Sequence, residues 1–125
     1  MIRATSSGSF DRTMSFLLKL QSKAIYDVLD RGGQKGVNAL RNATKFKSGR
    51  TRYSWRYKVY QERNKVGVYW YNLYEEDGVN IAVILQYGHG TGTGGYVEGI
   101  DYINPALRPV FDEILADVWR EVRYA

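Results

Sequence analysis

The feature that most constrains the fold is an alternation of side chains between residues 52 and 59. Aromatic or aliphatic residues take every second position, and polar or cationic residues stand between them: Tyr53, Trp55, Tyr57 and Val59 against Arg52, Ser54, Arg56 and Lys58. A period of two residues is typical of a β-strand with one buried face. A polar turn at 61–65 and a second aromatic run at 66–74 follow, so the segment 52–74 predicts an antiparallel β-hairpin.

Two helices are expected before this hairpin. Apolar residues recur three or four apart over 14–29, and Asp11 and Thr13 are candidate caps for the helix that this spacing predicts. Gly32-Gly33 is expected to end this helix, because glycine readily adopts the left-handed conformation found at helix C-termini. A shorter helix is expected over 34–43.

After the hairpin, the C-terminal segment has the clearest helical pattern. Asn104-Pro105 combines a capping side chain with a proline suited to the first turn, and apolar residues follow three or four apart to Val122. The segment 80–87 is too short for its periodicity to separate helix from strand, and Asn80 as a cap favours a helix. Six glycines lie within 88–99, which we expect to be the most flexible loop.

Together these elements predict a single α+β domain over residues 1–125. A small antiparallel sheet, the aromatic β-hairpin, packs against two N-terminal helices and a long C-terminal helix. Residues 1–10 are rich in serine and glycine and are expected to be loose. We find no repeat and no linker, and 125 residues is a usual length for one domain.

Composition narrows the classes of function. The sequence has no cysteine, which excludes disulfides, thiolate catalysis and cysteine-ligated zinc. Its one histidine, His89, has no orienting carboxylate close in sequence, so a small hydrolase or nuclease is a minor alternative. Carboxylates are not clustered at a metal-binding spacing, and no apolar run approaches the length of a membrane span. We expect no catalytic residues, no metal, no cofactor and no membrane contact.

A glycine-rich stretch precedes the expected C-terminal helix. Residues 90–95 match the dinucleotide-binding pattern G-x-G-x-x-G. That fingerprint requires the glycines to open a helix directly after a strand, so that the helix N-terminus meets the pyrophosphate. Residues 96–102 look extended instead, and the next helix is expected only at Asn104. We therefore reject a nucleotide site at this position.

Charge is divided unevenly along the chain. Residues 1–65 contain 15 of the 18 lysines and arginines but only 4 of the 13 acidic residues, and residues 66–125 contain the other 3 and 9. A molecule with a basic and an acidic part can attract copies of itself head to tail, or turn its basic part towards nucleic acid. The plainer alternative is that both sets are ordinary solvated surface.

Nucleic-acid binding through the hairpin 52–74 is the main alternative function. Interleaved cations and aromatic rings are typical of proteins that bind single strands. The alternation, however, places Tyr53, Trp55 and Tyr57 on one face and the arginines on the other, so we expect these rings to be core. Non-specific attraction to phosphates needs only a charged surface and stays open.

Two stretches of the sequence together resemble motifs of a known protein family. One is a basic loop that leads into a strand, Lys47-Ser48-Gly49-Arg50-Thr51-Arg52-Tyr53-Ser54-Trp55. The other is Ile84-Leu85-Gln86-Tyr87-Gly88-His89-Gly90-Thr91, followed by Tyr102-Ile103-Asn104-Pro105-Ala106-Leu107. In order and spacing they resemble the small neck or tail-completion proteins of long-tailed bacteriophages, over about residues 14–122. The chain departs from that family at Ser48, commonly threonine there, and at Gln86, often glutamate.

The resemblance implies a structural virion protein of the head–tail junction, made in the bacterial host cytoplasm. Relatives are thought to form rings, often of six subunits, that help to join head and tail around the DNA channel. The implied partners are further copies of the chain and neighbouring phage connector and tail proteins, with DNA nearby. Residues expected at subunit interfaces or facing the channel lie in the basic loop, at the start of the following strand and in the glycine-rich loop: Lys45, Lys47, Arg50, Arg52, Arg56, Gly88, His89, Gly90, Thr91 and Gly92.

Overall fold

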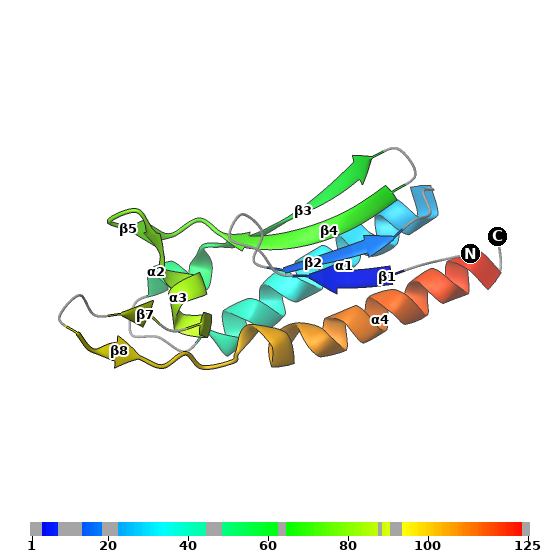
Figure 1. Cartoon of the computed structure of the whole chain (residues 1–125). Helices are drawn as coiled ribbons and strands as arrows, with labels where there is room; N and C mark the ends of the chain where they lie inside the picture. Colours follow the sequence, from blue (N-terminus) through cyan, green and yellow to red (C-terminus); the bar gives the residue numbers. More distant parts are fainter. Residues whose placement is uncertain are drawn as a thin grey trace.

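In this computed structural model, two long helices lie side by side on one face of an antiparallel sheet, and smaller elements gather at one end (Figure 1). The α+β class is therefore confirmed. The structure describes residues 4–7, 14–18, 23–44, 49–62, 65–87, 89–90 and 94–123.

The sheet has four strands in the order β1-β2-β4-β3, with each neighbouring pair antiparallel. Their bounds along the chain are Ala4–Ser7, Met14–Leu18, Trp55–Glu62 and Lys65–Asn72 for β1 to β4. The predicted hairpin is the β3–β4 half, in a register that pairs Tyr57 with Trp70. Strand β3 begins at Trp55, later than predicted, because Gly49–Tyr53 forms the short helix α2.

The prediction of two N-terminal helices is wrong. Residues 14–18 form β2, which pairs with β4, and residues 4–7 of the stretch expected to be loose form the edge strand β1. Over five residues the apolar run from Met14 to Leu18 fits a strand period as well as a helical one. Pairing with the second edge of β4 decides between them, because the backbone groups of that edge need partners. The proposed caps at residues 11 and 13 lie outside the described residues.

A single helix, α1 (Lys23–Ala43), replaces both predicted helices and runs through Gly32 and Gly33, where we expected an end. These two glycines and Gly36 are buried. Each faces a large side chain that leaves no room for a Cβ: Ile114 at Gly32, the ring of Tyr57 at Gly33 and the indole of Trp70 at Gly36. The glycines therefore allow close packing and do not terminate the helix.

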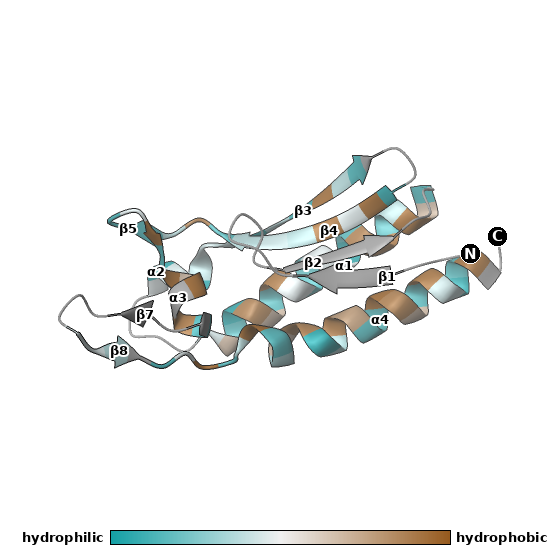
Figure 2. Ribbon diagram, viewed as in Figure 1, coloured by the Kyte–Doolittle hydropathy of each residue, from teal (hydrophilic) through white to brown (hydrophobic). Residues whose placement is uncertain are grey.

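The predicted long C-terminal helix is α4 (Ile103–Arg123), which runs antiparallel to α1 (Figure 1). It also reaches the sheet, since the rings of Phe111 and Trp70 lie 5.7 Å apart. Apolar residues form stripes along both helices (Figure 2). The largest fully buried side chains come from both helices and from β3 and β4: Ile25, Val28, Leu29, Leu40, Trp55, Val66, Val68, Trp70, Ile103, Leu107 and Ile114.

Small elements follow β4 at the end of the body where α1 stops and α4 starts (Figure 1). In chain order they are β5 (Glu75–Glu76), β6 (Val79–Asn80), α3 (Ile81–Tyr87), β7 (His89–Gly90) and β8 (Tyr96–Val97). Strands β5 and β6 form one hairpin, and β7 and β8 form another. We call this region, residues 73–102 as far as they are described, the hairpin end.

Local sequence explains two of these elements. Asp77 and Gly78 both have positive φ, 52° and 77°, which the two-residue turn of the β5–β6 hairpin requires at both positions. The helix favoured over 80–87 is confirmed as α3, and the Asn80 side chain accepts a hydrogen bond from the Val83 amide at 3.3 Å. The glycine-rich stretch 88–99 contains β7 and β8.

Candidate interaction surface

Buried polar side chains attach the hairpin end to the body. Asn72, at the end of β4, donates a hydrogen bond to the Thr51 carbonyl at 2.8 Å and accepts one from the Tyr74 amide at 3.0 Å. Asn80 donates to the Asn72 carbonyl at 2.8 Å. Because a buried polar group is costly when unpaired, these bonds fix α2, β4 and the β5–β6 hairpin relative to one another.

Gln86 joins α3 to the start of α4. Its Oε1 accepts hydrogen bonds from the amides of Tyr102 and Ile103, both at 2.9 Å, and its Nε2 donates to Asp101 Oδ1 at 2.7 Å. The first amides of a helix have no partner within the helix, so Gln86 caps α4 from a neighbouring helix. The predicted cap, Asn104, lies inside the first turn and donates to Asp101 at 3.0 Å.

Tyr102 provides another link to α3. Its hydroxyl donates to the Ala82 carbonyl at 2.7 Å, and burial raises the pKa of this phenol well above its ordinary value. The ring is therefore neutral and acts as a donor across the physiological range. Its contact with α3 is structural.

A further set of bonds holds the other side of this end. Thr44 is fully buried, and its Oγ1 accepts from Trp55 Nε1 at 2.9 Å and donates to the Leu40 carbonyl at 2.6 Å. Arg52 Nε donates to the Thr44 carbonyl at 2.9 Å. Arg52, one of the residues expected at an interface, is thus half-buried and helps to fix the C-terminus of α1.

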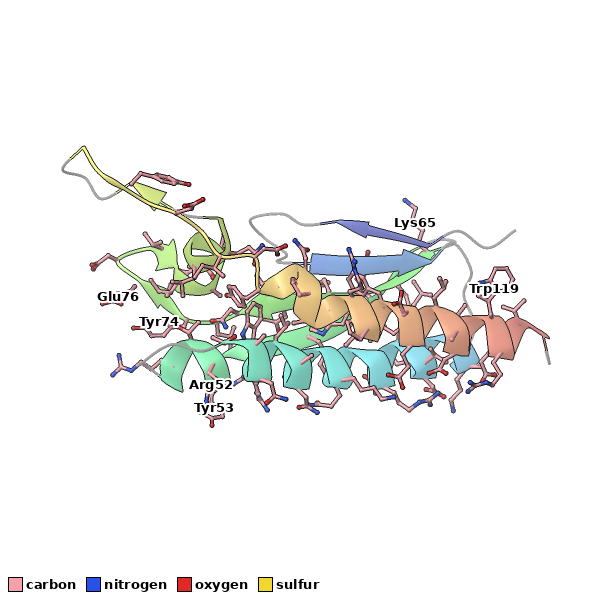
Figure 3. The ribbon with its side chains drawn as sticks, turned by 90° about the horizontal axis from the view of Figure 1, so that it is seen from below. Arg52, Tyr53, Lys65, Tyr74, Glu76 and Trp119 are labelled. Carbon is pink, nitrogen blue, oxygen red and sulfur yellow. The ribbon has the colours of Figure 1, made fainter. Side chains whose placement is uncertain are left out.

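Apolar side chains are exposed at the same end of the molecule. Their exposed fractions run from 40% to 70%, which is high for large apolar residues, and they come from α2 and the hairpin end: Tyr53, Leu73, Val79, Tyr96 and Ile100. Figure 3 places Arg52, Tyr53, Tyr74 and Glu76 at this end, and Lys65 and Trp119 at the opposite one. Apolar groups gathered on a protein surface commonly mark a contact with another molecule.

The hairpin end is also acidic. Between Lys65 and Arg108 the sequence has no lysine or arginine, and its five acidic residues are all exposed: Glu75, Glu76, Asp77, Glu98 and Asp101. Three of them stand side by side at the β5–β6 turn. None of these three forms an ion pair with another described residue.

A second surface is the face of β3 and β4 that points away from the helices (Figure 1). Side chains that alternate with the buried ones line it, in pairs set by the strand register, and we call it the outer sheet face: Arg56, Lys58, Tyr60, Lys65, Tyr69 and Tyr71. The ring centroids of Tyr60 and Tyr69 are 5.7 Å apart and those of Tyr69 and Tyr71 5.6 Å.

The alternation in β3 is therefore confirmed only in part. Trp55 is buried and Tyr57 packs against α1, while Arg56 and Lys58 point the other way, as predicted. The prediction that Tyr53 is core is wrong, because this residue belongs to α2 and is 62% exposed. Three tyrosines accompany these cations, which we did not predict. The run Tyr69-Trp70-Tyr71 was the available signal, because adjacent residues of a strand face opposite sides and one run thus supplies rings to both.

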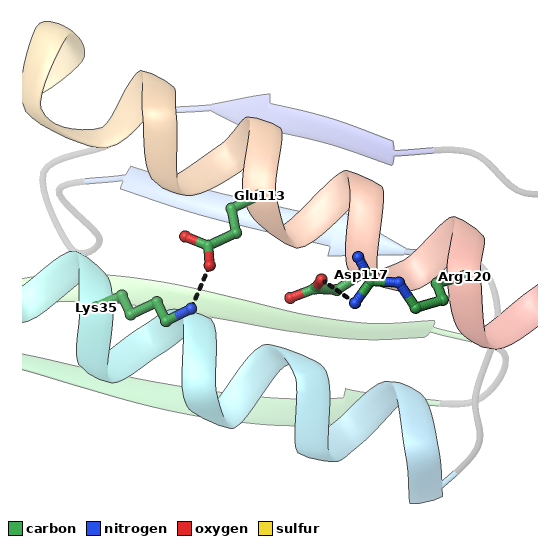
Figure 4. Close-up of polar contacts among 4 residues, drawn as sticks. All are labelled: Lys35, Glu113, Asp117 and Arg120. Carbon is green, nitrogen blue, oxygen red and sulfur yellow. Dashed lines mark hydrogen bonds and ion pairs between the residues drawn. The ribbon is translucent and has the colours of Figure 1, made fainter.

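The two charged halves of the sequence do not form two opposite poles. Helix α1 comes from the basic half and α4 from the acidic half, and Lys35 of α1 forms an ion pair with Glu113 of α4 (Figure 4). A second pair, Arg120 with Asp117, lies within α4 at 3.2 Å (Figure 4). Some of the opposite charge is thus matched within one chain, while other charged residues stand at the acidic hairpin end and on the basic outer sheet face.

The expected interface residues fall into three groups. Arg50 is exposed on α2, Arg56 is exposed at the start of β3, and Arg52 is half-buried. His89 and Gly90 form β7 and pair with Val97 and Tyr96. The structure thus brings α2 and the β7–β8 hairpin to the same end of the molecule. The others lie outside the described residues: Lys45, Lys47, Gly88, Thr91 and Gly92.

Two kinds of site, a metal centre and a dinucleotide site, can be compared with the described residues. These residues contain no group of three or more histidine, cysteine, aspartate or glutamate side chains placed to bind a metal ion. Gly90 pairs with Tyr96 in the β7–β8 hairpin, and the next helix among the described residues starts at Ile103, so the described glycines Gly90, Gly94 and Gly95 do not open a helix as a dinucleotide site requires. Within the described part of the chain, no helix has the length and apolar character needed to cross a membrane.

Comparison with protein families, with curated proteins and with solved structures finds no match for this chain.

Proposed function

We propose that this chain is a structural subunit of a bacteriophage head–tail junction, which assembles into a ring that helps to join head and tail around the DNA channel. One observation carries the proposal: five exposed apolar side chains gather at an acidic end of the molecule. The buried polar residues there, Asn72 and Gln86, already have partners and hold the fold together. A group of exposed apolar side chains suits a contact with another protein.

A ring follows from the presence of two different surfaces. The hairpin end is acidic and apolar, whereas the outer sheet face is basic and aromatic. A contact between unlike surfaces of identical chains is heterologous, and it closes into a ring when the rotation between subunits permits. The resemblance of residues 47–55, 84–91 and 102–107 to neck and tail-completion proteins supplies the biological setting.

Binding of single-stranded nucleic acid is the second candidate, favoured by the tyrosines and cations of the outer sheet face. The rings there are tilted against one another by 40° and 47° at centroid distances below 6 Å. They pack against each other along the sheet and are not separate platforms for successive bases. We therefore place protein contact first.

The experiment is a comparison of assembly between two surface variants. Purified chain is measured by native mass spectrometry, alone and with phage connector and tail proteins. Ile100→Asp, at the hairpin end, should lower the fraction assembled, while Trp119→Ser, an exposed aromatic at the opposite end, should leave it unchanged. Ile100 is 70% exposed and Trp119 is 49% exposed, so we expect only a small change in thermal stability. Wild-type chain that stays monomeric under every condition and binds none of those proteins contradicts the proposal.

A further inference from the structure

The acidic turn of the β5–β6 hairpin has no cationic partner among the residues that the structure describes. Glu75, Glu76 and Asp77 are consecutive and exposed, and none pairs with a cation among the described residues. The register places Val79, also exposed, directly across from Glu76. The hairpin thus presents clustered carboxylates beside an apolar side chain. Adjacent like charges repel, and an opposite charge on a second surface would relieve that repulsion.

The outer sheet face has the complementary composition. Arg56 and Lys58 are exposed, and neither forms an ion pair with another described residue. In the strand register they stand beside Tyr71 and Tyr69. This face therefore offers cations for carboxylates and aromatic rings for an apolar side chain, which is the mixture of apolar core and polar rim found in protein interfaces.

The two surfaces of one chain do not meet each other. The β5–β6 hairpin continues beyond the end of β4, while the outer sheet face lies along the length of β3 and β4 (Figure 1). Asn72 and Asn80 fix the base of the hairpin in this position through buried or half-buried hydrogen bonds. A protein partner for either surface would therefore come from another molecule.

We propose that the β5–β6 hairpin of one copy docks on the outer sheet face of the next copy, with Glu75, Glu76 and Asp77 facing Arg56 and Lys58, and Val79 against the tyrosine rings. This inference rests on the proposed function, because it names the contact that would build the ring. The contact joins unlike surfaces, so each copy binds one neighbour through its β5–β6 hairpin and another through its outer sheet face.

A nucleic acid is a poorer occupant of the outer sheet face. Phosphates would satisfy Arg56 and Lys58, but they would leave the exposed Leu73 and Val79 without a role. The three carboxylates beside those residues would repel a polyanion wherever it passed the hairpin. A contact between two copies pairs the carboxylates of one with the cations of the other and covers the apolar side chains as well.

The test uses charge reversal on each surface separately. The first variant carries Glu75→Lys and Glu76→Lys, and the second carries Arg56→Glu and Lys58→Glu. Oligomer mass and dissociation constant are measured by analytical ultracentrifugation at low salt. Wild-type chain should assemble, and each variant alone should assemble at least ~10-fold more weakly, because like charges then face each other. Mixing the two variants should restore assembly into rings that alternate the two chains.

Two control variants and a measurement of stability accompany the charge reversals. Reversal of Arg108 and Asp112, exposed on α4 away from both surfaces, should leave assembly unchanged. The single change Lys58→Glu is included because Arg56 also donates to the carbonyls of Tyr53 and Trp55, at 2.9 and 2.8 Å. Thermal unfolding of every variant shows whether the fold is intact.

The result separates failure of this contact from failure of the proposed function. If wild-type chain forms a ring and both reversed variants assemble as well as it does, the docking contact is wrong and the ring stands. If wild-type chain assembles neither alone nor with phage connector and tail proteins, both are wrong. If reversal of Arg56 and Lys58 removes salt-dependent binding of a single-stranded oligonucleotide and leaves assembly intact, the face binds nucleic acid and the docking contact is overturned.

Discussion

The indole nitrogen of Trp70 donates a hydrogen bond to the backbone carbonyl of Gly33, 2.9 Å away, and so links the centre of the sheet to the middle of α1. This approach depends on the glycines that line the buried side of α1. A Cβ at Gly36 would overlap the same indole ring. The close packing of the two long helices and the sheet therefore depends on glycines, which ordinarily weaken a helix.

Gly36→Ala should destabilise the protein, although the same change in an exposed helix would stabilise it by up to ~1 kcal/mol. Trp70 is fully buried and cannot move aside, so we expect a net loss of about 1–3 kcal/mol in the free energy of unfolding, as for other overpacked cores. Urea denaturation measures this loss. Arg31→Ala, exposed on the same helix, is the control and should change stability by less than ~0.5 kcal/mol. A Gly36→Ala protein more stable than wild type would contradict the close packing.

Gln86→Glu should destabilise the protein at neutral pH and less so near pH 4. The substitution replaces the amide that donates to Asp101 with a second carboxylate, and two carboxylates at this distance repel. Asp101 is exposed and water screens the pair, so we expect a loss of about 1 kcal/mol. Protonation of one carboxyl at low pH restores a donor and removes the repulsion. Chemical denaturation at both pH values measures the effect, with Gln34→Glu on α1 as an exposed control; equal losses at both pH values would argue against it.

Stability should fall in alkaline solution. Burial raises the pKa of the Tyr102 phenol, and burial followed by the hydrogen bond donated to Asp30 raises that of Tyr57. A folded-state pKa above the unfolded value means that the unfolded chain loses its proton first. The contribution of each tyrosine is then fully present below about pH 10 and is lost as the pH rises towards the folded-state value.

Denaturation at a series of pH values from 8 to 11 measures this loss. Tyr102→Phe should reduce the steepness of the decline, because one of the two groups that titrate with a raised pKa is removed. Tyr53→Phe changes an exposed ring and should leave the slope unchanged. A slope that Tyr102→Phe does not alter would show that this phenol is not the titrating group.

Removing the Lys35–Glu113 ion pair should have little effect. Both side chains are about half exposed, and water and salt screen such pairs. We expect Glu113→Gln to change the free energy of unfolding by no more than ~1 kcal/mol. The antiparallel contact of α1 and α4 depends on buried apolar residues such as Leu29 and Ile114 instead. A larger loss in urea denaturation would show that the ion pair matters more than its exposure suggests.

The sequence correctly predicted those parts of the fold in which the spacing of apolar residues was compatible with only one type of secondary structure. The alternation around Trp55 indicated a strand, and the spacing from Leu107 to Val122 indicated a helix. The start of the chain was misassigned because Met14 to Leu18 satisfies both periods and its pairing with distant β4 leaves no local signal. Glycines inside α1 gave the wrong helix end, because a close contact with Trp70 is decided by the tertiary structure.

The surface was harder to predict than the fold. The basic loop pointed to Arg50 and Arg52, but nothing in the local sequence showed that Arg52 would be bound to the Thr44 carbonyl. Exposure of Leu73 and Ile100 depends on how the hairpin end projects from the body, which local patterns do not encode. The distribution of charged residues along the sequence suggested a basic part and an acidic part of the molecule. The pairing of α1 with α4 instead places helices from the basic and acidic halves of the sequence side by side.

The mass of the purified wild-type chain across a wide range of concentration tests the central claim most directly. A ring-forming subunit should give one closed species whose mass is a fixed whole multiple of 14.4 kDa and does not grow further with concentration. A 14.4 kDa monomer at every concentration that also binds no phage connector or tail protein, or an open-ended series of growing sizes, would contradict the account.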